Sequence, residues 1–336
     1  MPRSKPPILR LCELEPGQQA DFFALLAERS KSSTREGKPY FTCRFRDKVR
    51  TASFMVWGDG EYYKLCEAEW KEGQCFKIRA VLGLHERYGP QLEIQQIRPV
   101  NDEDGADGFD PLDFVESSRF KSEEMFEELC KIAETLILDE WLRTLVLTLL
   151  ERHAERLKRI PATQRHFFPF AGGWIEHTLS VTRSCLQLAD RYIQHYPEMK
   201  PPLNRDLLLA GAILHDIGRV AEFDDGIPAQ PTVPGRLFGH LFLGRDLIRE
   251  AAREIEGLNS ELLQLLEHLV ISHLNLPEWG SPRLPLIPES LILHHADDLD
   301  AKLEMYVRCL TKDSADGPFT DRDPVLNRQL FKGRSV

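Results

Sequence analysis

The sequence predicts a multidomain α+β protein in which a small β-barrel is followed by an all-α helical bundle. The chain of 336 residues exceeds the usual size of one small domain. Apolar residues alternate with a period of two between residues 38 and 100, and they recur at helical spacing beyond residue 111. An acidic, glycine-containing stretch, NDEDGADGFDP, lies between the two patterns. We therefore expect domains over residues 1–100 and 112–336, joined by a linker over residues 101–111.

Five short strands are expected between residues 38 and 100. The strand-like segments there are YFTCRFRD, TASFMVW, QCFKIRAVLGLHE and QLEIQQIRPV. Glycine or proline occurs at residues 58–60, 72–73 and 88–90, where the strands would need turns. One helix is expected near residues 61–69, between the third and fourth strands. A segment of this kind, with a basic and aromatic face, fits an OB-fold barrel, and an SH3-like barrel remains an alternative.

Beyond the linker, nearly every segment has the periodicity of a helix packed on one face. The expected helices cover residues 122–137, 139–160, 177–193, 205–217, 240–255, 260–274 and 289–310. The second domain should therefore be an all-α bundle.

Composition and charge limit the possible partners. No apolar run reaches the length of a bilayer span, and the basic start of the chain lacks the apolar region of a signal peptide. The seven cysteines are scattered without a C-x-x-C pair, which favours reduced thiols. We therefore expect a cytoplasmic protein with no membrane partner.

The net charge of -10 is unevenly distributed along the chain. Residues 1–100 hold 17 Lys and Arg against 13 Asp and Glu, whereas the remaining residues hold 26 against 40. A mildly basic front domain can hold a phosphate backbone, and carboxylates gathered at a site favour divalent metals.

Histidine and aspartate residues form a candidate metal site in the helical domain. His215 and Asp216 stand together at the end of the apolar segment LLLAGAILHDIGR, where Gly218 is expected to stop the helix. A His-Asp pair alone is weak evidence, but four further groups lie in separate helical segments: His177, His240, His273 and Asp297. Imidazoles and carboxylates from several helices can enclose a divalent ion. Such an ion lowers the pKa of a bound water and polarises a phosphoryl oxygen, so metal-assisted phosphate hydrolysis is expected.

The ordered set His177, His215-Asp216 and Asp297 resembles the H...HD...D pattern of the HD phosphohydrolase superfamily. Over most of its length the chain also resembles the YhaM-like 3′-to-5′ exoribonucleases, which join an OB domain to an HD domain in this order. The similarity lies in the segments GKPYFTCRFRD, GGWIEHTLSV, AGAILHDIGR, FGHLFLG, ISHLNLPEWGSP, LHHADDLDAK and GPFTDRDPVLNRQLFKG. The resemblance implies an OB-fold barrel followed by an HD-domain helical bundle.

The resemblance also implies roles for individual residues. It implies that the first metal ion is held by His177, His215, Asp216 and Asp297, with His240 and His273 as candidates for a second ion or the scissile phosphate. Members of this family release nucleoside monophosphates from the 3′ ends of RNA or single-stranded DNA, usually with manganese or a similar ion. We therefore expect Mn, with Fe, Co, Ni or Mg as alternatives.

Two residues depart from the family pattern. Arg219 stands where Lys is common, and its guanidinium can still clamp a phosphate. Leu274 stands where a second His commonly follows His273, and it cannot bind a metal, so one ion is expected more firmly than two. Catalytic roles are expected for Asp216, Arg219, His240 and His273.

The front domain carries a candidate surface for single-stranded RNA or DNA. It is formed by Lys38, Tyr40, Arg44, Arg46, Lys48, Arg50 and Trp57. The four residues Arg44, Arg46, Lys48 and Arg50 would share one side of the strand pair if the strand ran unbroken. The alternative is a solvated strand face with Tyr40 and Trp57 buried in the barrel. In the helical domain, Phe167, Phe168 and Phe170 are expected to pack the bundle.

Three functions remain open from the sequence. The first is an exonuclease in which the barrel feeds a single strand to the metal centre. The second is a phosphohydrolase that acts on a small nucleotide, and the third is a non-catalytic protein that binds single strands. The sequence does not indicate the oligomeric state.

Overall fold

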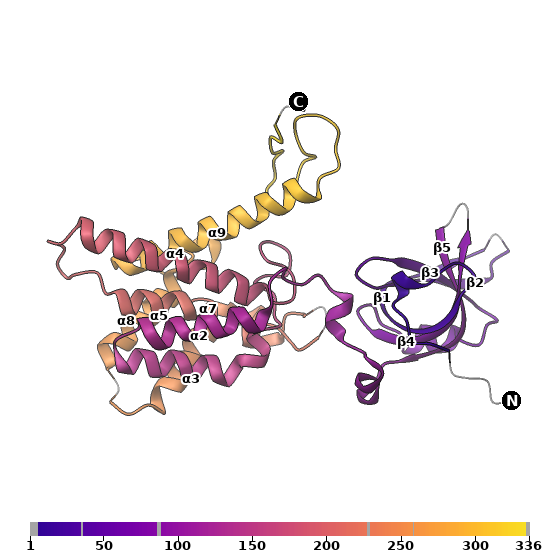
Figure 1. Cartoon of the computed structure of the whole chain (residues 1–336), viewed down its shortest axis with the longest axis horizontal. Helices are drawn as coiled ribbons and strands as arrows, with labels where there is room; N and C mark the ends of the chain where they lie inside the picture. The colour runs from indigo at the N-terminus through magenta and orange to yellow at the C-terminus, as the bar shows by residue number, and fades with distance from the viewer. Residues whose placement is uncertain (1–5, 35, 86–88, 227–228, 258, 334–336) are drawn as a thin grey trace. The chain divides into compact units, whose positions relative to one another are not determined.

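The computed structural model describes residues 6–34, 36–85, 89–226, 229–257 and 259–333. The chain divides into two compact units, Met1–Glu116 and Ser117–Val336 (Figure 1). The first unit contains the strands and the second contains the long helices.

The first unit is a closed barrel with the strand order β1-β2-β3-β5-β4. The strands are β1 (Gln19–Ser33), β2 (Pro39–Arg46), β3 (Thr51–Trp57), β4 (Cys75–His85) and β5 (Gly89–Pro99), and the short helix α1 (Tyr63–Ala68) lies between β3 and β4. Neighbouring strands are antiparallel except for the parallel pair β3 and β5. A five-stranded barrel with this order is an OB fold, so the expected fold class is confirmed.

The prediction that all five strands follow residue 38 is wrong, because β1 lies before it. Every residue from Ala20 to Leu26 is buried, so the segment lacks the alternation that marks a strand in the sequence. This strand curls around the barrel, pairing with β4 through its first half and with β2 through its second half, and its register shifts between Leu26 and Glu28. One face of the strand packs in the barrel core, and the other face, with Phe23 and Leu25, is covered by Phe114, so a strand buried on both faces resembles a buried helix in its sequence.

The barrel core is aromatic and determines which side chains point outward. Phe45, Trp70 and Phe76 contact one another with ring centroids 5.2–6.2 Å apart. On β2, Phe41 and Phe45 are buried in this core. Because side chains alternate along a strand, Cys43 points inward with these two rings, whereas Thr42 and Arg44 point outward.

Residues 101–111 differ from the expected linker because they pack on the barrel. They form a 3-10 helix, Asp102–Asp107, and a second one begins at Pro111. The buried Asp104 carboxylate accepts hydrogen bonds from Arg98 (Nη2–Oδ1, 2.6 Å) and Lys77 (Nζ–Oδ1, 3.1 Å). The Arg98 guanidinium holds the pKa of Asp104 well below its usual range. This acidic segment therefore neutralises basic side chains of β4 and β5.

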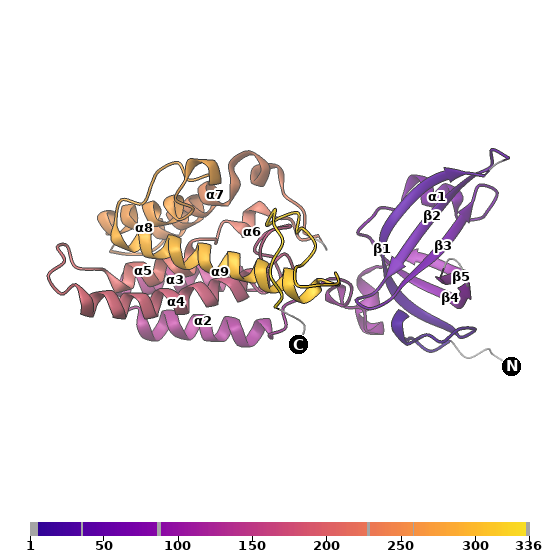
Figure 2. The same cartoon turned by 90° about the horizontal axis from the view of Figure 1, so that it is seen from above.

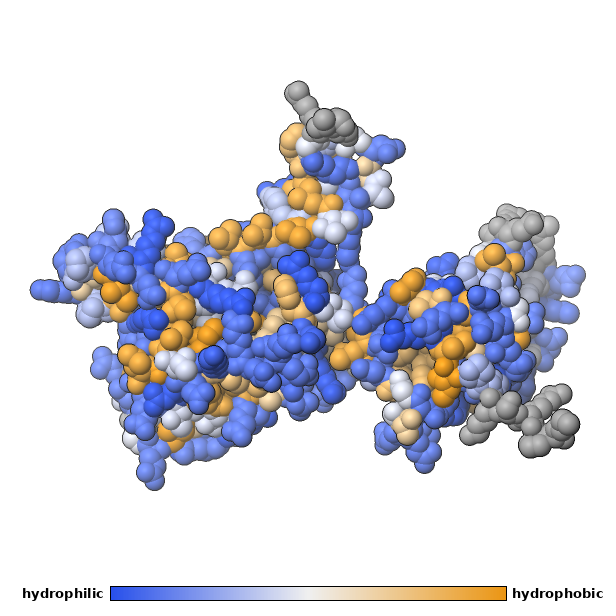
Figure 3. Space-filling view, in the orientation of Figure 1, coloured by the Kyte–Doolittle hydropathy of each residue, from blue (hydrophilic) through white to orange (hydrophobic). Residues whose placement is uncertain are grey.

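The second unit is a helical bundle, shown from two directions in Figures 1 and 2. Its helices are α2 (Ser122–Leu136), α3 (Glu140–Leu157), α4 (Gly173–His195), α5 (Arg205–Leu214), α6 (Arg219–Glu222), α7 (Val233–Arg253), α8 (Ser260–Ser272) and α9 (Pro288–Lys312). No helix among the described residues is long and apolar enough to cross a membrane. In Figure 3 apolar side chains also appear on the surface of α9, where Leu299, Leu303 and Val307 are exposed.

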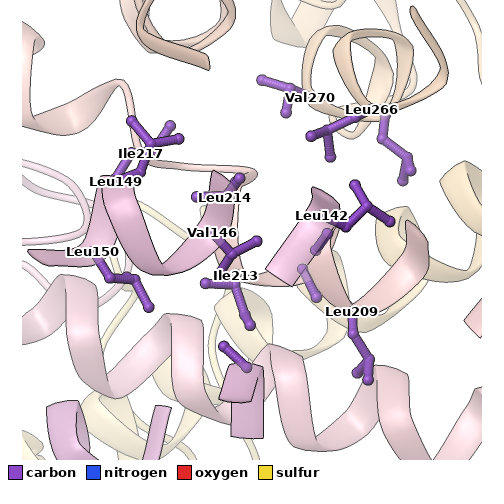
Figure 4. Packing of buried hydrophobic residues seen from close by; sticks show 14 of the residues in the cluster. Leu142, Val146, Leu149, Leu150, Leu209, Ile213, Leu214, Ile217, Leu266 and Val270 are labelled. Carbon is purple, nitrogen blue, oxygen red and sulfur yellow. The ribbon is translucent and has the colours of Figure 1, made fainter. Parts of the chain in front are cut away.

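Helix α5 lies at the centre of the bundle. Asn204 caps its start by accepting a hydrogen bond from the Leu207 amide at 3.0 Å, and every residue from Leu207 to Leu214 is buried. Figure 4 shows Leu209 and Ile213 of α5 among apolar side chains of α3 and α8. This packing carries the end of α5, with His215 and Asp216, into the interior.

Candidate metal centre

The structure gathers the predicted imidazole and carboxylate groups of the helical unit at one place. His177 lies on α4, His215 and Asp216 follow α5, His240 lies on α7, His273 follows α8, and Asp297 lies on α9. All six side chains are buried. Side chains far apart in the sequence thus share a site inside the bundle.

The first group of ligand atoms comes from His177, His215 and Asp297. The Nε2 atom of His177 lies 3.0 Å from Oδ1 of Asp297 and 3.4 Å from Nε2 of His215. Nε2 of His215 lies 4.0 Å from the same carboxylate oxygen. Ligand atoms that surround one ion at about 2.1 Å lie roughly 3.0–3.4 Å apart, so this spacing fits a common ion after small movements.

The second group shares His215 with the first and adds Asp216 and His273. Nε2 of His273 lies 3.8 Å from Oδ1 of Asp216 and 4.0 Å from Oδ2 of Asp297. Nε2 of His240 lies 3.1 Å from Oδ1 of Asp216. Asp216 therefore lies among imidazoles that come from different helices.

Hydrogen bonds on the far side of the rings fix their tautomers. Nδ1 of His215 lies 2.8 Å from the carbonyl oxygen of Ala212, and Nδ1 of His273 lies 2.7 Å from that of Val270. A carbonyl can only accept, so Nδ1 donates the proton and Nε2 presents a lone pair to the centre. Such contacts orient imidazole ligands of metals.

His177 is oriented by a carboxylate that the sequence analysis missed. Its Nδ1 lies 2.8 Å from Oδ2 of Asp300, whose Oδ1 accepts a hydrogen bond from Ser180 at 2.5 Å. Asp300 follows Asp297 by three residues on α9, so both carboxylates share one helix face. The spacing of Asp297 and Asp300 in the segment ADDLDAK could have identified this second carboxylate in the sequence.

The electrostatics favour a cation. Burial lowers the pKa of His177, but hydrogen bonds with Asp297 and Asp300 outweigh burial and raise the pKa to about 10. Burial by itself would raise the pKa of Asp297, yet the hydrogen bond from His177 lowers it to about 2. Burial, with repulsion from His215, lowers the pKa of His273 to about 3. The Asp297 carboxylate is thus charged at neutral pH, while the His273 imidazole is neutral and keeps a free lone pair on Nε2.

Two buried atoms test whether the site fits a metal ion. Oδ1 of Asp216 and Nε2 of His240 are buried and lie 3.1 Å apart, yet neither makes a hydrogen bond of acceptable geometry with the other or with any other described residue. Leaving such a group unsatisfied costs about 1–3 kcal/mol, or more when it is charged. Two carboxylates and the imidazoles form a donor set that one divalent ion would neutralise, with the ion taking the place of the proton that His177 otherwise carries beside Asp297. The residues therefore fit a divalent metal.

Arg219 contacts the centre through Asp216. Its Nε donates to Oδ2 of Asp216 at 3.2 Å, and its Nη1 donates to Oε2 of Glu222 at 2.5 Å. Glu222, which the sequence analysis did not single out, also faces Nδ1 of His240 at 3.7 Å. The guanidinium thus positions Asp216, while its expected contact with phosphate stays a prediction.

Gly218 has a different role from the expected helix stop. Its φ of -63° is right-handed, and a short helix, α6, follows directly. A Cβ atom at this position would lie 2.0 Å from the carbonyl oxygen of His240. Gly239, with φ of 70°, kinks α7 at that point. The missing side chain at Gly218 therefore allows α7 to bring His240 beside Asp216.

Replacement of Gly218 with Ala should damage the centre without touching any ligand atom. The added methyl group must push the His240 main chain away, and we expect the free energy of unfolding to fall by about 3 kcal/mol. Urea unfolding measures this change. Gly105→Ala is the matched control, because an added Cβ there meets nothing within 4 Å. If Gly218→Ala and Gly105→Ala had the same free energy of unfolding, Gly218 would not be needed for the close approach of α7.

The barrel surface is only partly as predicted. Trp57, on β3, is 48% exposed and pairs across the strands with Tyr40, on β2, with ring centroids 5.3 Å apart. The alternative in which both rings are buried is therefore wrong. Arg44 also points outward, in an exposed ion pair with Glu28 at 3.1 Å. Such pairs contribute little stability, so Arg44 can exchange partners.

The expectation that Lys48 and Arg50 continue the same strand face is wrong. β2 ends at Arg46, and both residues lie in the turn before β3. Arg50 donates hydrogen bonds to the carbonyl oxygens of Leu11 and Leu14, so its guanidinium holds the N-terminal segment against the barrel. Lys38 is exposed just before β2, and Arg46 is half-buried.

Comparison with known proteins agrees with this architecture. A family model described as "HD domain" matches residues 174–302, and one described as "Putative helicase" matches residues 117–222. The 3′-5′ exoribonuclease YhaM of Geobacillus sp. (strain WCH70) is 33% identical over 324 residues, which cover 95% of this chain and 93% of that protein.

Solved structures resemble shorter parts of the chain. A domain of replication protein A from Methanococcus maripaludis is 14% identical, covering 28% of this chain and 96% of that chain, with a TM-score of 0.23. Asparaginyl-tRNA synthetase from Entamoeba histolytica, in complex with asparaginyl-adenylate, is 11% identical. The match covers 48% of this chain and 38% of that chain, with a TM-score of 0.22.

Proposed function

Since the chain belongs to the family of the 3′-5′ exoribonuclease YhaM, we propose that it removes nucleoside 5′-monophosphates one at a time from the 3′ end of single-stranded RNA. It is a metal-dependent hydrolase with an OB barrel and an HD domain. The observation that carries the proposal is the convergence of buried imidazoles and carboxylates that lie on or directly after five helices. Manganese is the proposed ion, and single-stranded DNA is proposed as a second substrate.

The roles of the residues follow from their contacts. His177, His215, Asp216 and Asp297 would hold the ion. When bound, a divalent ion polarises a phosphoryl oxygen and makes a water molecule acidic enough to attack phosphorus. Asp300 and the main-chain carbonyls keep the imidazole lone pairs directed at the centre.

Hydrolysis would break the bond between phosphorus and the 3′-oxygen of the penultimate nucleotide. The water oxygen joins phosphorus, and the leaving 3′-oxygen gains a proton, so the products are a 5′-monophosphate and a chain with a new 3′-hydroxyl. His240 is 8% exposed, more than any of the other five side chains at the centre, and therefore the best placed to contact an entering phosphate. We propose that His240 and His273 position the scissile phosphate.

The barrel would hold the strand upstream of the cleavage site. The exposed Tyr40–Trp57 pair offers aromatic faces on β2 and β3, which is the surface that OB folds use for oligonucleotides. Arg44 and Lys38 lie on or beside β2 and would contact phosphates. Stacking on aromatic rings does not depend on base identity, so this surface suits an enzyme that degrades many sequences.

Trp57→Ala should weaken binding of single-stranded RNA by about 5- to 150-fold, since one base–aromatic stack contributes roughly 1–3 kcal/mol. Fluorescence anisotropy with a labelled oligonucleotide, in the presence of a chelator to prevent cleavage, measures the affinity. Leu84→Ala is the control, because Leu84 is 69% exposed on β4. If both variants bind as the wild type does, the β2–β3 surface is not the RNA site.

Product analysis tests the proposed function. The protein is incubated with Mn and a single-stranded oligonucleotide that is blocked at its 3′ end, blocked at its 5′ end, or unblocked. We expect nucleoside monophosphates from the unblocked and 5′-blocked strands, and none from the 3′-blocked strand. Hydrolysis of free nucleotides with intact strands would instead indicate a small-molecule phosphohydrolase. Strand binding without cleavage would indicate a non-catalytic binding protein.

A further inference from the structure

The loop of residues 161–171, between α3 and α4, brings aromatic side chains to the metal centre. The ring centroid of Phe167 lies 5.0 Å from that of His177, and the ring centroid of Phe168 lies 5.3 Å from it. Phe168 is 5% exposed, whereas Phe167 is only half-buried. The two neighbouring rings therefore both contact the His177 imidazole, but only Phe167 also faces solvent.

Hydrogen bonds within the loop hold it in a strained conformation. Phe168 has a φ of 42°, which is uncommon for an aromatic residue and is maintained only where the surroundings enforce it. The Ala162 amide donates to the carbonyl oxygen of Phe168 at 3.1 Å. The Thr163 hydroxyl donates to the carbonyl oxygen of Phe167 at 2.7 Å. The loop is thus closed on itself beside the centre.

Helix α9 adds a second anchor to the same loop. Oε2 of Glu304 accepts a hydrogen bond from the Phe168 amide at 3.1 Å. Arg308 donates to the carbonyl oxygen of His166, and its Nε donates to Oε1 of Glu304 at 3.0 Å. Because α9 also carries Asp297, one helix positions both a metal-site carboxylate and the aromatic loop.

Shielding of His177 does not by itself account for this arrangement. The buried Phe168 already packs on the imidazole, and a second aromatic residue left partly in solvent would be an unfavourable way to fill the same space. Arg165, two residues earlier, is exposed and has no ion-pair partner in the part of the chain that the structure describes. A half-exposed aromatic face with a nearby free cation is the combination that binds single-stranded nucleic acid.

We propose that Phe167 is the platform on which the base of the 3′-terminal nucleotide stacks while its 5′-phosphate lies at the metal centre. The proposal rests on the exonuclease function proposed above and adds a positioning residue to it. Stacking there would align the scissile phosphate without selecting among bases, because every base offers a π face. Phe167 would thus act on the nucleotide that is released, whereas the barrel holds the strand that remains.

A cycle that removes each partner of the stack in turn tests the proposal. Wild-type protein and Phe167→Leu are each assayed with Mn on an oligonucleotide with a normal 3′ end and on one whose 3′-terminal nucleotide lacks its base. We expect each single change to lower kcat/KM by about 5- to 150-fold, and the two together to lower it no further than one alone. Phe167→Trp should retain activity on the normal strand.

Phe170→Leu is the matched control, because Phe170 lies on the same loop but packs on Phe168 at 5.9 Å. It should leave kcat/KM near the wild-type value. Manganese content of Phe167→Leu, measured after dialysis, should equal that of the wild type.

Two results would overturn the platform and leave the exonuclease in place. One is equal wild-type activity on strands with and without the terminal base. The other is a decrease in kcat/KM of Phe167→Leu that is as large on the strand with the abasic 3′ end as on the normal strand. A decrease that accompanies loss of manganese would have the same meaning, because Phe167 would then only shield His177. If the wild type cuts neither strand, the exonuclease proposal fails and the platform fails with it.

Discussion

Asp216→Asn is expected to lower kcat on single-stranded RNA by at least about 1,000-fold at saturating Mn. The carboxylate lies 3.1 Å from His240, 3.8 Å from His273 and 3.2 Å from the Arg219 guanidinium. Asparagine keeps the size of the side chain but removes one of the two negative charges that a divalent ion would neutralise. Losing one preorganised charged group at a reacting centre commonly costs 100- to 1,000-fold, and here metal binding weakens too.

Asp298→Asn is the control for this variant. Asp298 lies beside Asp297 on α9, but its half-buried carboxylate pairs with Lys302 at 2.7 Å and is absent from the metal groups. The kcat of Asp298→Asn should match that of the wild type. Circular dichroism would show whether Asp216→Asn is still folded, and near-normal turnover by a folded Asp216→Asn protein would refute the role of this carboxylate.

Removal of the metal should abolish activity and also destabilise the helical unit. Without the ion, buried carboxylates and imidazoles lose their counter-charge. An ion present at 100 times its Kd stabilises the folded state by about 2.7 kcal/mol, which corresponds to a decrease in Tm of about 5–10 °C for a unit of this size when the ion is removed. Calorimetry with and without chelator measures the shift, and added Mn should reverse it.

The barrel provides an internal control for the metal experiment. Among the described residues, both groups that could hold a metal lie in the helical unit. The barrel transition should therefore stay at the same temperature when the chelator is added. Retained activity, or an unchanged transition of the helical unit, would argue against a metal centre there.

The sequence predicted the components of the site because of where they lie on their helices. Helix α5 is apolar on all sides, so its end had to be buried, and His215 and Asp216 had to be buried with it. The other four groups lie in amphipathic segments. Helical periodicity can therefore place polar residues in a core. The structure brings five of the six side chains into the two groups that could hold a metal, and His240 lies beside Asp216.

The contacts that orient the ligands could not be predicted in the same way. Asp300 and Glu222 act through side-chain hydrogen bonds whose partners are set by helix packing, which one sequence does not specify. The close approach at Gly218 depends on the kink at Gly239, more than twenty residues later. On the barrel, Arg50 bonds main-chain carbonyls of the N-terminal segment, and no strand pattern reveals that contact.

The position of the metal ion tests the central claim most directly. Crystals of the protein grown with Mn, measured at the manganese absorption edge, locate the ion by its anomalous scattering. We expect a peak within about 2.4 Å of Nε2 of His177 and His215 and of a carboxylate oxygen of Asp297, with Asp216 also in contact. An ion bound elsewhere, or no ion while these side chains keep their places, would contradict the proposed centre.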